Sequence, residues 1–442
     1  MGLPRINPHV AGIDVGSEQL FVAVVDGPVK VFETFTESLH ALRDHLLGAA
    51  VESVVMEATG VYWMALYDVL EAAGIEVLVV NGAHVKSLPG RKSDMADPQW
   101  LAQLHSCGLL RGGFVPPAVI RRLRDYQRLR QDHVRMGSSH IQHMQKALDL
   151  MNIKIHEVLS DLTGMSGMRM VRAIVDGVRD PRMLAELCDR QVLTKKRDRL
   201  LKALRGNWHA QHIFALRQAL EGWEFYQRQI QECDRQIAVV LEELAESFPP
   251  PAGGDGLPPV ARKGTKRIHH NAPLIARLHE LLIRITRGRD LSLLPALSDK
   301  TVLELLSEIG TDMSPWPSVK HFVAWLGLAP SSRQSGKRRR REKRFRGRAG
   351  QLLCVAARSL ARSKYLALGG FYRRIKAKRG GLVANVAAAR KLAVLIYNAL
   401  RYGIDYVEQG LERYEAAYRE QRLKHLKRSA RDLGMTLVPA NA

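Results

Sequence analysis

Short apolar runs alternate with helical stretches between residue 9 and about residue 110. The runs HVAGIDVG, LFVAVVDG and VKVFETFT predict three strands, with Gly27 and Pro28 in a tight connection. Two later runs, ESVVMEATG and EVLVVNG, predict a fourth and a fifth strand. Between these runs, SLHALRDHLLGAA predicts a helix with Ser38 as N-cap, and VYWMALYDVLEAAG predicts a helix that ends at Gly74. Three leading strands followed by strands separated by helices predict an α/β domain with a mixed sheet.

The pattern becomes helical after Val115-Pro116-Pro117. Residues 119–150 and 210–247 carry apolar positions at helical spacing, which predicts long helices that are partly coiled coil, although Gly137 interrupts the period. A stretch that begins PPPAGGDGLPP at Pro249 has the composition of a linker or an exposed insertion. Residues beyond it predict another mostly helical unit.

These patterns predict a fold of the α/β plus all-α class. The expected parts are an α/β domain at 1–118, a helical or coiled-coil dimerisation region at 119–248, a linker or insertion with a connecting helix at 249–295, a mostly helical C-terminal domain at 296–415 and a charged tail at 416–442.

Composition points to a polyanionic partner. The 442 residues include 67 Lys and Arg against 44 Asp and Glu, a formal net charge of +23. Such an excess favours contact with phosphates, so nucleic acid is the first expectation and an anionic membrane surface the second. No uninterrupted apolar run is long enough to span a bilayer and the N-terminus, MGLPRINPHV, lacks a signal core, so no membrane partner is expected. The four cysteines form no C-x-x-C pair, which fits a reducing cytoplasm.

Four acidic residues stand where the strand pattern does not favour them. Asp14 interrupts the first strand, Glu57 closes the fourth, and Asp94 and Asp97 follow the fifth. An unpaired buried carboxylate costs several kcal/mol, and converging carboxylates repel one another. A divalent ion removes this conflict, and oxygen-only ligands suit Mg²⁺ or Mn²⁺, ions that support phosphodiester chemistry.

Each of these acids also has a simpler interpretation. Asp14 alone would be a turn residue and Glu57 alone a surface acid. Asp94 and Asp97 are spaced for one helical face. Because Pro98 disfavours α conformation at the preceding residue, Asp97 could instead cap a helix that begins at Pro98. Only the joint placement of the four around one expected sheet favours a metal site.

The blocks that carry these acids resemble those of a known family. GIDVGS, VVMEATG and GRKSDMADPQWLAQLHSCGLLRGGFVPP are similar to successive blocks of the insertion-sequence 110 family of transposases, and the similarity continues to TVLELLSEIGTDMSPWPSVKHFVAWLGLAPSSRQSG. The resemblance implies a RuvC-like, ribonuclease-H-type fold for residues 1–118, and a C-terminal transposase domain with a catalytic serine. The implied Mg²⁺ ligands are Asp14, Glu57, Asp94 and Asp97.

The implied serine is Ser335, with Ser331 and Ser332 as alternatives, because Gly336-Lys337 stands where the family has Gly-Gly. A serine hydroxyl needs help from a base or a metal to become a nucleophile. The family recombines donor and target DNA through a covalent phosphoserine, in a composite site built from two subunits and guided by a structured bridge RNA. The resemblance therefore implies a homo-oligomer, a dimer that assembles to a tetramer, in a prokaryotic cytoplasm and associated with the nucleoid.

Basic segments adjoin the implied serine and the start of the helical region. KRRRREKRFRGR follows Ser335 directly, and an arginine cluster follows Pro117. Either could be a solvated charged surface, but contact with a DNA or RNA backbone is expected. The predicted nucleic-acid-binding residues are Arg121, Arg122, Arg124, Arg128, Lys337, Arg338, Arg339, Arg340, Arg341, Lys343, Arg344, Arg346 and Arg348.

Three further patterns are less specific. Residues 371–379 combine aromatic and basic side chains that either stack on bases or face the core. LSDKTVLELLSEIG resembles a helix-hairpin-helix element. Pairs at H-x-x-H spacing, His140 with His143 and His209 with His212, are expected to be ordinary helix residues, because no further ligand stands nearby in the sequence.

The first hypothesis is therefore a DNA recombinase, and three alternatives stay open. A RuvC-like, structure-specific DNA endonuclease would need only the acidic residues. An actin-like ATPase or sugar kinase would share the first strand and loop, but we find no second Asp-Gly hairpin at the expected later strand. A non-catalytic nucleic-acid scaffold would need no carboxylates at strand ends.

Overall fold

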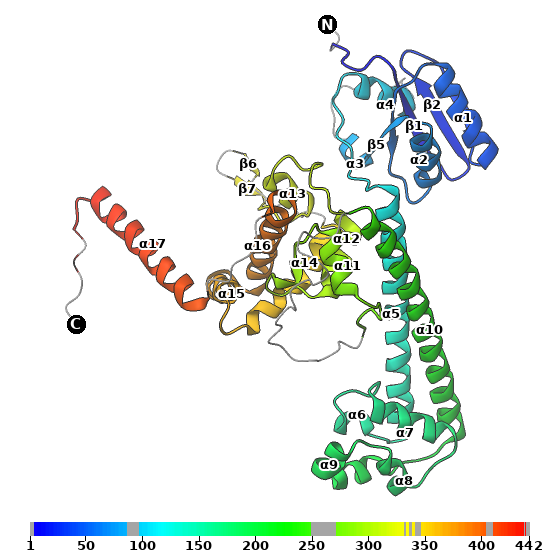
Figure 1. Cartoon of the computed structure of the whole chain (residues 1–442), viewed down its shortest axis with the longest axis vertical. Helices are drawn as coiled ribbons and strands as arrows, with labels where there is room; N and C mark the ends of the chain where they lie inside the picture. Colours follow the sequence, from blue (N-terminus) through cyan, green and yellow to red (C-terminus); the bar gives the residue numbers. More distant parts are fainter. Residues whose placement is uncertain are drawn as a thin grey trace. The chain divides into compact units, whose positions relative to one another are not determined.

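The structure of the protein is a computed structural model, shown in Figure 1. It describes residues 4–85, 97–248, 271–330, 333–335, 338–340, 346–403, 410–436 and 438. The chain divides into two compact units, Met1–Val115 and Pro116–Ala442.

The first unit is built on a five-stranded mixed sheet with the strand order β3-β2-β1-β4-β5. β1 pairs antiparallel with β2 and parallel with β4, β2 pairs antiparallel with β3, and β4 pairs parallel with β5. The strands are β1 (Val10–Val15), β2 (Gln19–Val24), β3 (Val29–Glu33), β4 (Ser53–Glu57) and β5 (Glu76–Val80). The five predicted strands and the mixed sheet are confirmed.

Helices cover both faces of this sheet. Ile13 and Met56 face a core that also contains buried leucines of α1 (Thr36–Gly48) and α2 (Trp63–Ala72). On the other face, Val55 packs with Trp100 and Leu101 of α4 (Asp97–Ser106). The two burial patterns follow from the alternation of side chains along a strand.

One predicted helix start in this unit was wrong. α1 begins at Thr36, and its N-cap residue is Phe35, whose side chain makes no capping hydrogen bond. Ser38 therefore lies in the first turn of the helix rather than at its cap. The connection at Gly27 is tight as predicted, because the Gly27 N–H donates to the Val24 carbonyl at 2.8 Å.

Two long helices dominate the start of the second unit. α5 (Ala118–Leu150) and α10 (Ala210–Glu246) lie side by side along their length (Figure 1). Gly137 does not interrupt α5, because it is buried against α10, where a Cβ would lie 3.6 Å from Tyr226 Cβ. At Gly222 of α10 the fit is tighter, because a Cβ there would lie 2.3 Å from His140 Cε1. Small residues therefore let the two helices approach closely.

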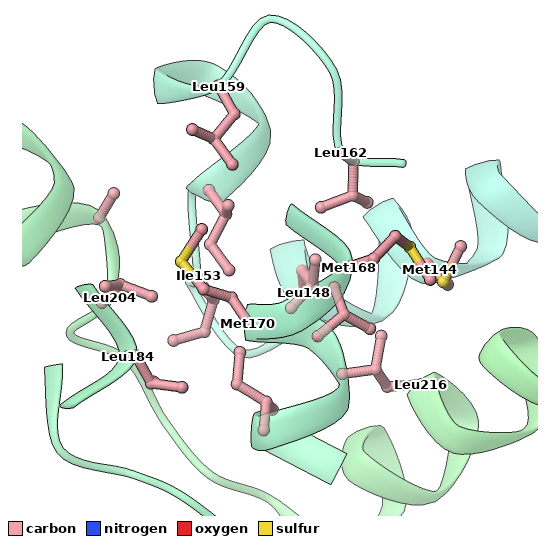
Figure 2. Close-up of a cluster of buried hydrophobic side chains, with 14 of the residues drawn as sticks. Met144, Leu148, Ile153, Leu159, Leu162, Met168, Met170, Leu184, Leu204 and Leu216 are labelled. Carbon is pink, nitrogen blue, oxygen red and sulfur yellow. The ribbon is translucent and has the colours of Figure 1, made fainter. Parts of the chain in front are cut away.

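Four shorter helices pack around a separate core at the C-terminal end of α5 and the N-terminal end of α10. Figure 2 shows Met144 and Leu148 of α5 and Leu216 of α10 packed against side chains of this group. The helices are α6 (Ile155–Val158), α7 (Met165–Val175), α8 (Pro181–Glu186) and α9 (Arg190–Ala203).

The C-terminal part of the second unit is mostly helical, as predicted, and contains a two-stranded hairpin. The described elements are α11 (Leu278–Ile285), η1 (Leu291–Leu293), α12 (Asp299–Ile309), α13 (Val319–Trp325), β6 (Arg333–Ser335), β7 (Arg338–Arg340), α14 (Arg348–Ser359), η2 (Leu360–Arg362), α15 (Ala367–Arg379), α16 (Gly381–Tyr402) and α17 (Leu411–Asp432). Most of the predicted linker, residues 249–270, lies outside the described residues.

α16 is the core helix of this part. It is long and apolar enough to cross a membrane by length and composition alone, but half of its most apolar window is buried inside the protein. Its buried Tyr397 donates a hydrogen bond to the Trp316 carbonyl at 2.8 Å. Arg390 and Lys391 lie in the middle of the helix, so the apolar run is interrupted. Burial accounts for its composition without a membrane.

Candidate functional site

Asp14 and Glu57 are neighbours across the parallel pair of strands. Ile13 of β1 pairs with Met56 of β4, so the next residue on each strand stands at the same level. Paired residues on neighbouring strands lie about 4.8 Å apart, and their side chains point to the same face. The expectation that the end of the first strand and the end of the fourth lie side by side is therefore correct.

The face that they share is the one covered by α4. Gly12, two residues before Asp14, is pressed against this helix, because a Cβ at Gly12 would lie 2.1 Å from the Pro98 carbonyl oxygen. At the other end of α4, His105 Nε2 lies 2.8 Å from Ser53 Oγ, at the start of β4. The helix thus runs antiparallel to β1 and β4.

This direction places Asp97 toward the end of the sheet where Asp14 and Glu57 stand. Asp97 is the first described residue of α4, next to Pro98. Asp94, the fourth predicted acid, lies outside the described residues. Three of the four acids are therefore brought to one face and one end of the sheet.

Gly82, the first residue of α3 (Gly82–Val85), makes room for the Glu57 carboxylate. A Cβ at position 82 would lie 1.8 Å from Glu57 Oε1 and 2.3 Å from Cδ. No residue larger than glycine fits at position 82 while Glu57 keeps its position. The backbone that follows β5 therefore lies close against the Glu57 carboxylate.

The donor chemistry of these residues fits a hard divalent cation. All the side chains concerned are carboxylates, the ligands that Mg²⁺ and Mn²⁺ prefer. Among the described residues, which omit Asp94, no group of three or more His, Cys, Asp or Glu side chains is close enough together to hold a metal ion. Asp14 and Glu57 would form the centre of such a site.

Ser335 ends a strand of a small basic hairpin. Its backbone pairs with that of Arg338, and Gln334 and Arg333 pair with Arg339 and Arg340. The sequence did not predict this hairpin, and the structure describes only the backbone of its strands. The predicted residues Ser331, Ser332, Lys337, Arg341, Lys343 and Arg344 lie outside the described part of the chain.

The arginines after Pro117 make contacts within the protein. Arg124 donates to the backbone carbonyls of Ser307 and Glu308, the latter at 2.6 Å. Arg128 holds both carboxylate oxygens of Glu308, at 2.9 and 2.8 Å. Burial lowers the pKa of Arg124 to about 10, although Glu308 opposes this shift. These two arginines therefore join α5 to α12.

The other two predicted arginines of this cluster have partners as well. Arg122 forms an ion pair with Glu243 of α10, and Arg121 donates to the Pro116 carbonyl at 2.9 Å. Arg130, in the same helix, is buried and paired with Asp234. Contact of this cluster with nucleic acid stays a prediction.

The aromatic residues of the segment 371–379 pack within the protein. Tyr372 is buried, and the Arg374 guanidinium lies 5.6 Å from the Phe371 ring centroid and 3.8 Å from that of Tyr418. Of the two interpretations offered by the sequence, the structure favours core packing over base stacking for these side chains.

The basic surface of α9 was not predicted from the sequence. Its six exposed basic side chains are Arg190, Lys195, Lys196, Arg197, Arg199 and Lys202. The signal was present as KKRDR at 195–199, but such a run is compatible with any solvated helix. His140 and His143 lie within α5 with their rings edge to face at 5.9 Å, whereas His209 is the N-cap residue of α10 and His212 lies in its first turn. That neither pair binds a metal stays a prediction.

Comparison with protein families agrees with this arrangement. Residues 11–153 match a family model described as "Transposase", the DEDD transposase domain of IS110, and residues 289–373 match the "Transposase IS116/IS110/IS902 family". No curated protein matches the chain. A mixed sheet of the RuvC-like kind followed by a mostly helical region, with both family matches, defines a transposase, an enzyme that recombines DNA. The chain belongs to the IS110 family of transposases, the transposases of a group of insertion sequences.

Proposed function

We propose that the protein cuts and rejoins DNA through a 5′-phosphoserine intermediate. Ser335 is the nucleophile, and Asp14, Glu57, Asp94 and Asp97 are the ligands of Mg²⁺ or Mn²⁺. The observation that carries the proposal is the placement of Asp14, Glu57 and Asp97 at one end and on one face of the sheet. A purely structural role would not require acids at this end and on this face of the sheet.

The chemistry conserves the energy of the phosphodiester bond. The Ser335 hydroxyl oxygen attacks phosphorus, the bond to the 3′ oxygen breaks, and the serine proton leaves with a base while the 3′ oxygen gains one. Attack by a 3′ hydroxyl of another strand then releases the serine and rejoins the DNA. When bound, Mg²⁺ would offset the repulsion among the carboxylates and stabilise negative charge on the phosphate and the leaving oxygen.

The proposed partners are donor DNA, target DNA and a structured bridge RNA. The net charge of +23 supports binding to more than one polyanion. The strand Arg338–Arg340, paired with the strand that ends in Ser335, supports phosphate contact near the proposed nucleophile. We further propose a homo-oligomer, a dimer that assembles to a tetramer, which acts in the cytoplasm at the nucleoid.

The proposed division of labour follows the boundaries expected from sequence. Residues 1–118 would bind metal, 119–248 would dimerise, 249–295 would link, 296–415 would supply the serine, and 416–442 would form a tail. The observed break between the two units, at residues 115 and 116, supports the first of these boundaries.

The metal-binding part of the proposal is tested by DNA cleavage with the full chain. Asp14→Asn and Glu57→Gln should each reduce Mg²⁺-dependent strand cleavage by at least about a thousandfold, while the circular dichroism spectrum stays unchanged. Asp44→Asn is the matched control, because this carboxylate is exposed on α1. Full cleavage by the Asp14 and Glu57 variants would remove these acids from the site.

A further inference from the structure

The last helix, α17, is a basic surface that neither family match covers. Its residues Leu411–Asp432 lie beyond residue 373, where the second match ends. No residue of this helix is buried. Its second half, from Arg422 to Asp432, carries five lysines and arginines and one acid, the terminal Asp432.

The basic side chains of this half share one face. Lys424, Lys427, Arg428 and Arg431 follow the spacing i, i+3, i+4 and i+7, which aligns them on a single side of a helix. Lys424 pairs with Glu420 at 2.7 Å. Within the part of the chain that the structure describes, no ion pair joins the other three to a carboxylate. We call these four residues the α17 basic face.

The first half of α17 is anchored to α15, which leaves the second half for another partner. The Arg374 guanidinium lies over the Tyr418 ring at 3.8 Å and near the Tyr414 ring at 5.1 Å. The Leu411 N–H donates to the Tyr365 carbonyl at 2.8 Å. Such contacts hold the helix by its first two turns, and the α17 basic face begins only after them.

We propose that the α17 basic face binds the sugar-phosphate backbone of duplex DNA that flanks the reacting phosphates. The proposal rests on the proposed function only in that DNA is the substrate. Four positive charges on one exposed face complement a phosphate backbone, and residues 424 to 431 span about 10 Å, the rise of about three phosphates along one strand.

Duplex DNA fits this helix better than the other polyanion. The major groove of B-DNA is about 12 Å wide and admits an α-helix, which brings a basic face to the phosphates along the groove edge, whereas the major groove of A-form RNA is too narrow and deep to admit it. A second copy of the chain is also a poorer fit. The apolar side chains of this half, Leu423 and Leu426, are only 44% and 41% exposed and lie beside the basic face rather than on it.

The test compares salt-dependent DNA binding by two full-length variants of equal charge. The first changes Lys424, Lys427, Arg428 and Arg431 to Gln, a residue that keeps helix propensity. The control changes Arg135, Arg172, Arg235 and Arg277 to Gln, because each of these exposed arginines already pairs with a carboxylate. Binding of a random-sequence DNA duplex is measured by fluorescence anisotropy over a range of NaCl concentrations.

We expect the α17 variant to bind DNA at least about tenfold more weakly than the wild type. The plot of log association constant against log salt concentration has a negative slope, and the magnitude of this slope should decrease by about 3. The control variant should retain the wild-type slope to within about 1. Equal slopes for the two variants would overturn the proposal. A loss confined to binding of a structured RNA hairpin, or a change in oligomer mass without a change in DNA binding, would also overturn it.

Failure of this proposal is distinguishable from failure of the proposed function. At saturating DNA, the α17 variant should cleave at the wild-type rate, because none of its four residues belongs to the proposed site. Asp14→Asn should do the reverse, since it should retain DNA affinity and lose cleavage.

Discussion

At the scale of single residues, the position of the Glu57 carboxylate depends on a glycine in another element. Gly82 follows β5, and no atom of its own acts chemically, yet its missing side chain is what lets Glu57 keep its position. Displacement of a catalytic group by about 1 Å can cost on the order of a hundredfold in rate.

Gly82→Ala should therefore reduce metal-dependent cleavage by about 10- to 100-fold with little loss of overall stability. The measurement is the initial rate of DNA cleavage beside a thermal melt. Gly48→Ala is the control, because a Cβ at that position meets no atom within 4 Å. Wild-type cleavage by the Gly82 variant would mean that Glu57 need not hold its observed position.

The sequence predicted some of these residue placements and missed others. The placement of Asp14 beside Glu57 was predictable because the first and fourth apolar runs were expected to be neighbouring strands of one sheet, with their ends side by side. The role of Gly82 was not, because it depends on a contact between two elements. Arg124 and Arg128 illustrate the same limit, because their partner Glu308 lies about 180 residues away in the sequence.

At the scale of elements, the pairing of α5 with α10 contains a buried ion pair. Arg130 Nε donates to Asp234 Oδ1 at 2.6 Å, and the two side chains are 1% and 2% exposed. The Arg130 guanidinium also donates to the Asn271 carbonyl, and the Leu274 N–H donates to Asp234. The pair thus fixes the chain that leads into the C-terminal helices.

Arg130→Ala should lower the free energy of unfolding by about 3–5 kcal/mol, because Asp234 would remain buried without its cation. Chemical denaturation followed by circular dichroism measures this loss. Arg235→Ala, which removes an exposed ion pair with Glu232, should cost about 0–1 kcal/mol. Similar losses in both variants would contradict a special role for the buried pair.

The same pair of helices should respond to pH through His140. Burial, together with the nearby His143, holds the pKa of His140 below its ordinary value of 6.5. The unfolded chain therefore takes up a proton at a higher pH than the folded chain does. The contribution of His140 to the free energy of unfolding is therefore fully present above about pH 6.5. It should decline as the pH falls from that value toward the lower pKa of the folded state.

His140→Phe should weaken this decline, because it removes the titrating group and keeps an aromatic ring against Tyr226. In the wild-type structure the centroids of the His140 and Tyr226 rings lie 5.5 Å apart. The free energy of unfolding measured between about pH 7 and pH 5 tests this expectation. A steeper decline in the His140 variant would contradict the expected direction of the effect.

Most of the elements could be predicted from the sequence, and the exceptions have physical causes. Apolar periodicity gave the five strands and the long helices, because burial on one face imposes that periodicity. Gly137 interrupts the apolar period of α5 but not the helix, and its position against α10 compensates its low helix propensity. The hairpin of β6 and β7 was missed because its residues are polar and carry no apolar alternation.

At the scale of the whole molecule, the proposed catalytic residues are distributed over both units. The first unit carries the described acids on its own sheet, with hydrophobic cores on both faces. The second unit carries the hairpin with Ser335 and most of the basic surfaces. The break between the units was predictable from Val115-Pro116-Pro117, because prolines end the strand and helix patterns there.

The central claim is that Ser335 and the acidic residues serve one recombination reaction. The most direct measurement incubates the full chain with Mg²⁺, RNA from the end of its element and labelled donor and target DNA, and separates protein–DNA adducts under denaturing conditions. We predict a protease-sensitive covalent adduct that disappears in Ser335→Ala and in Asp14→Asn, and that persists in Asp44→Asn. Metal-dependent cleavage that leaves no adduct would contradict the account and would make the protein a nuclease whose serine plays no part.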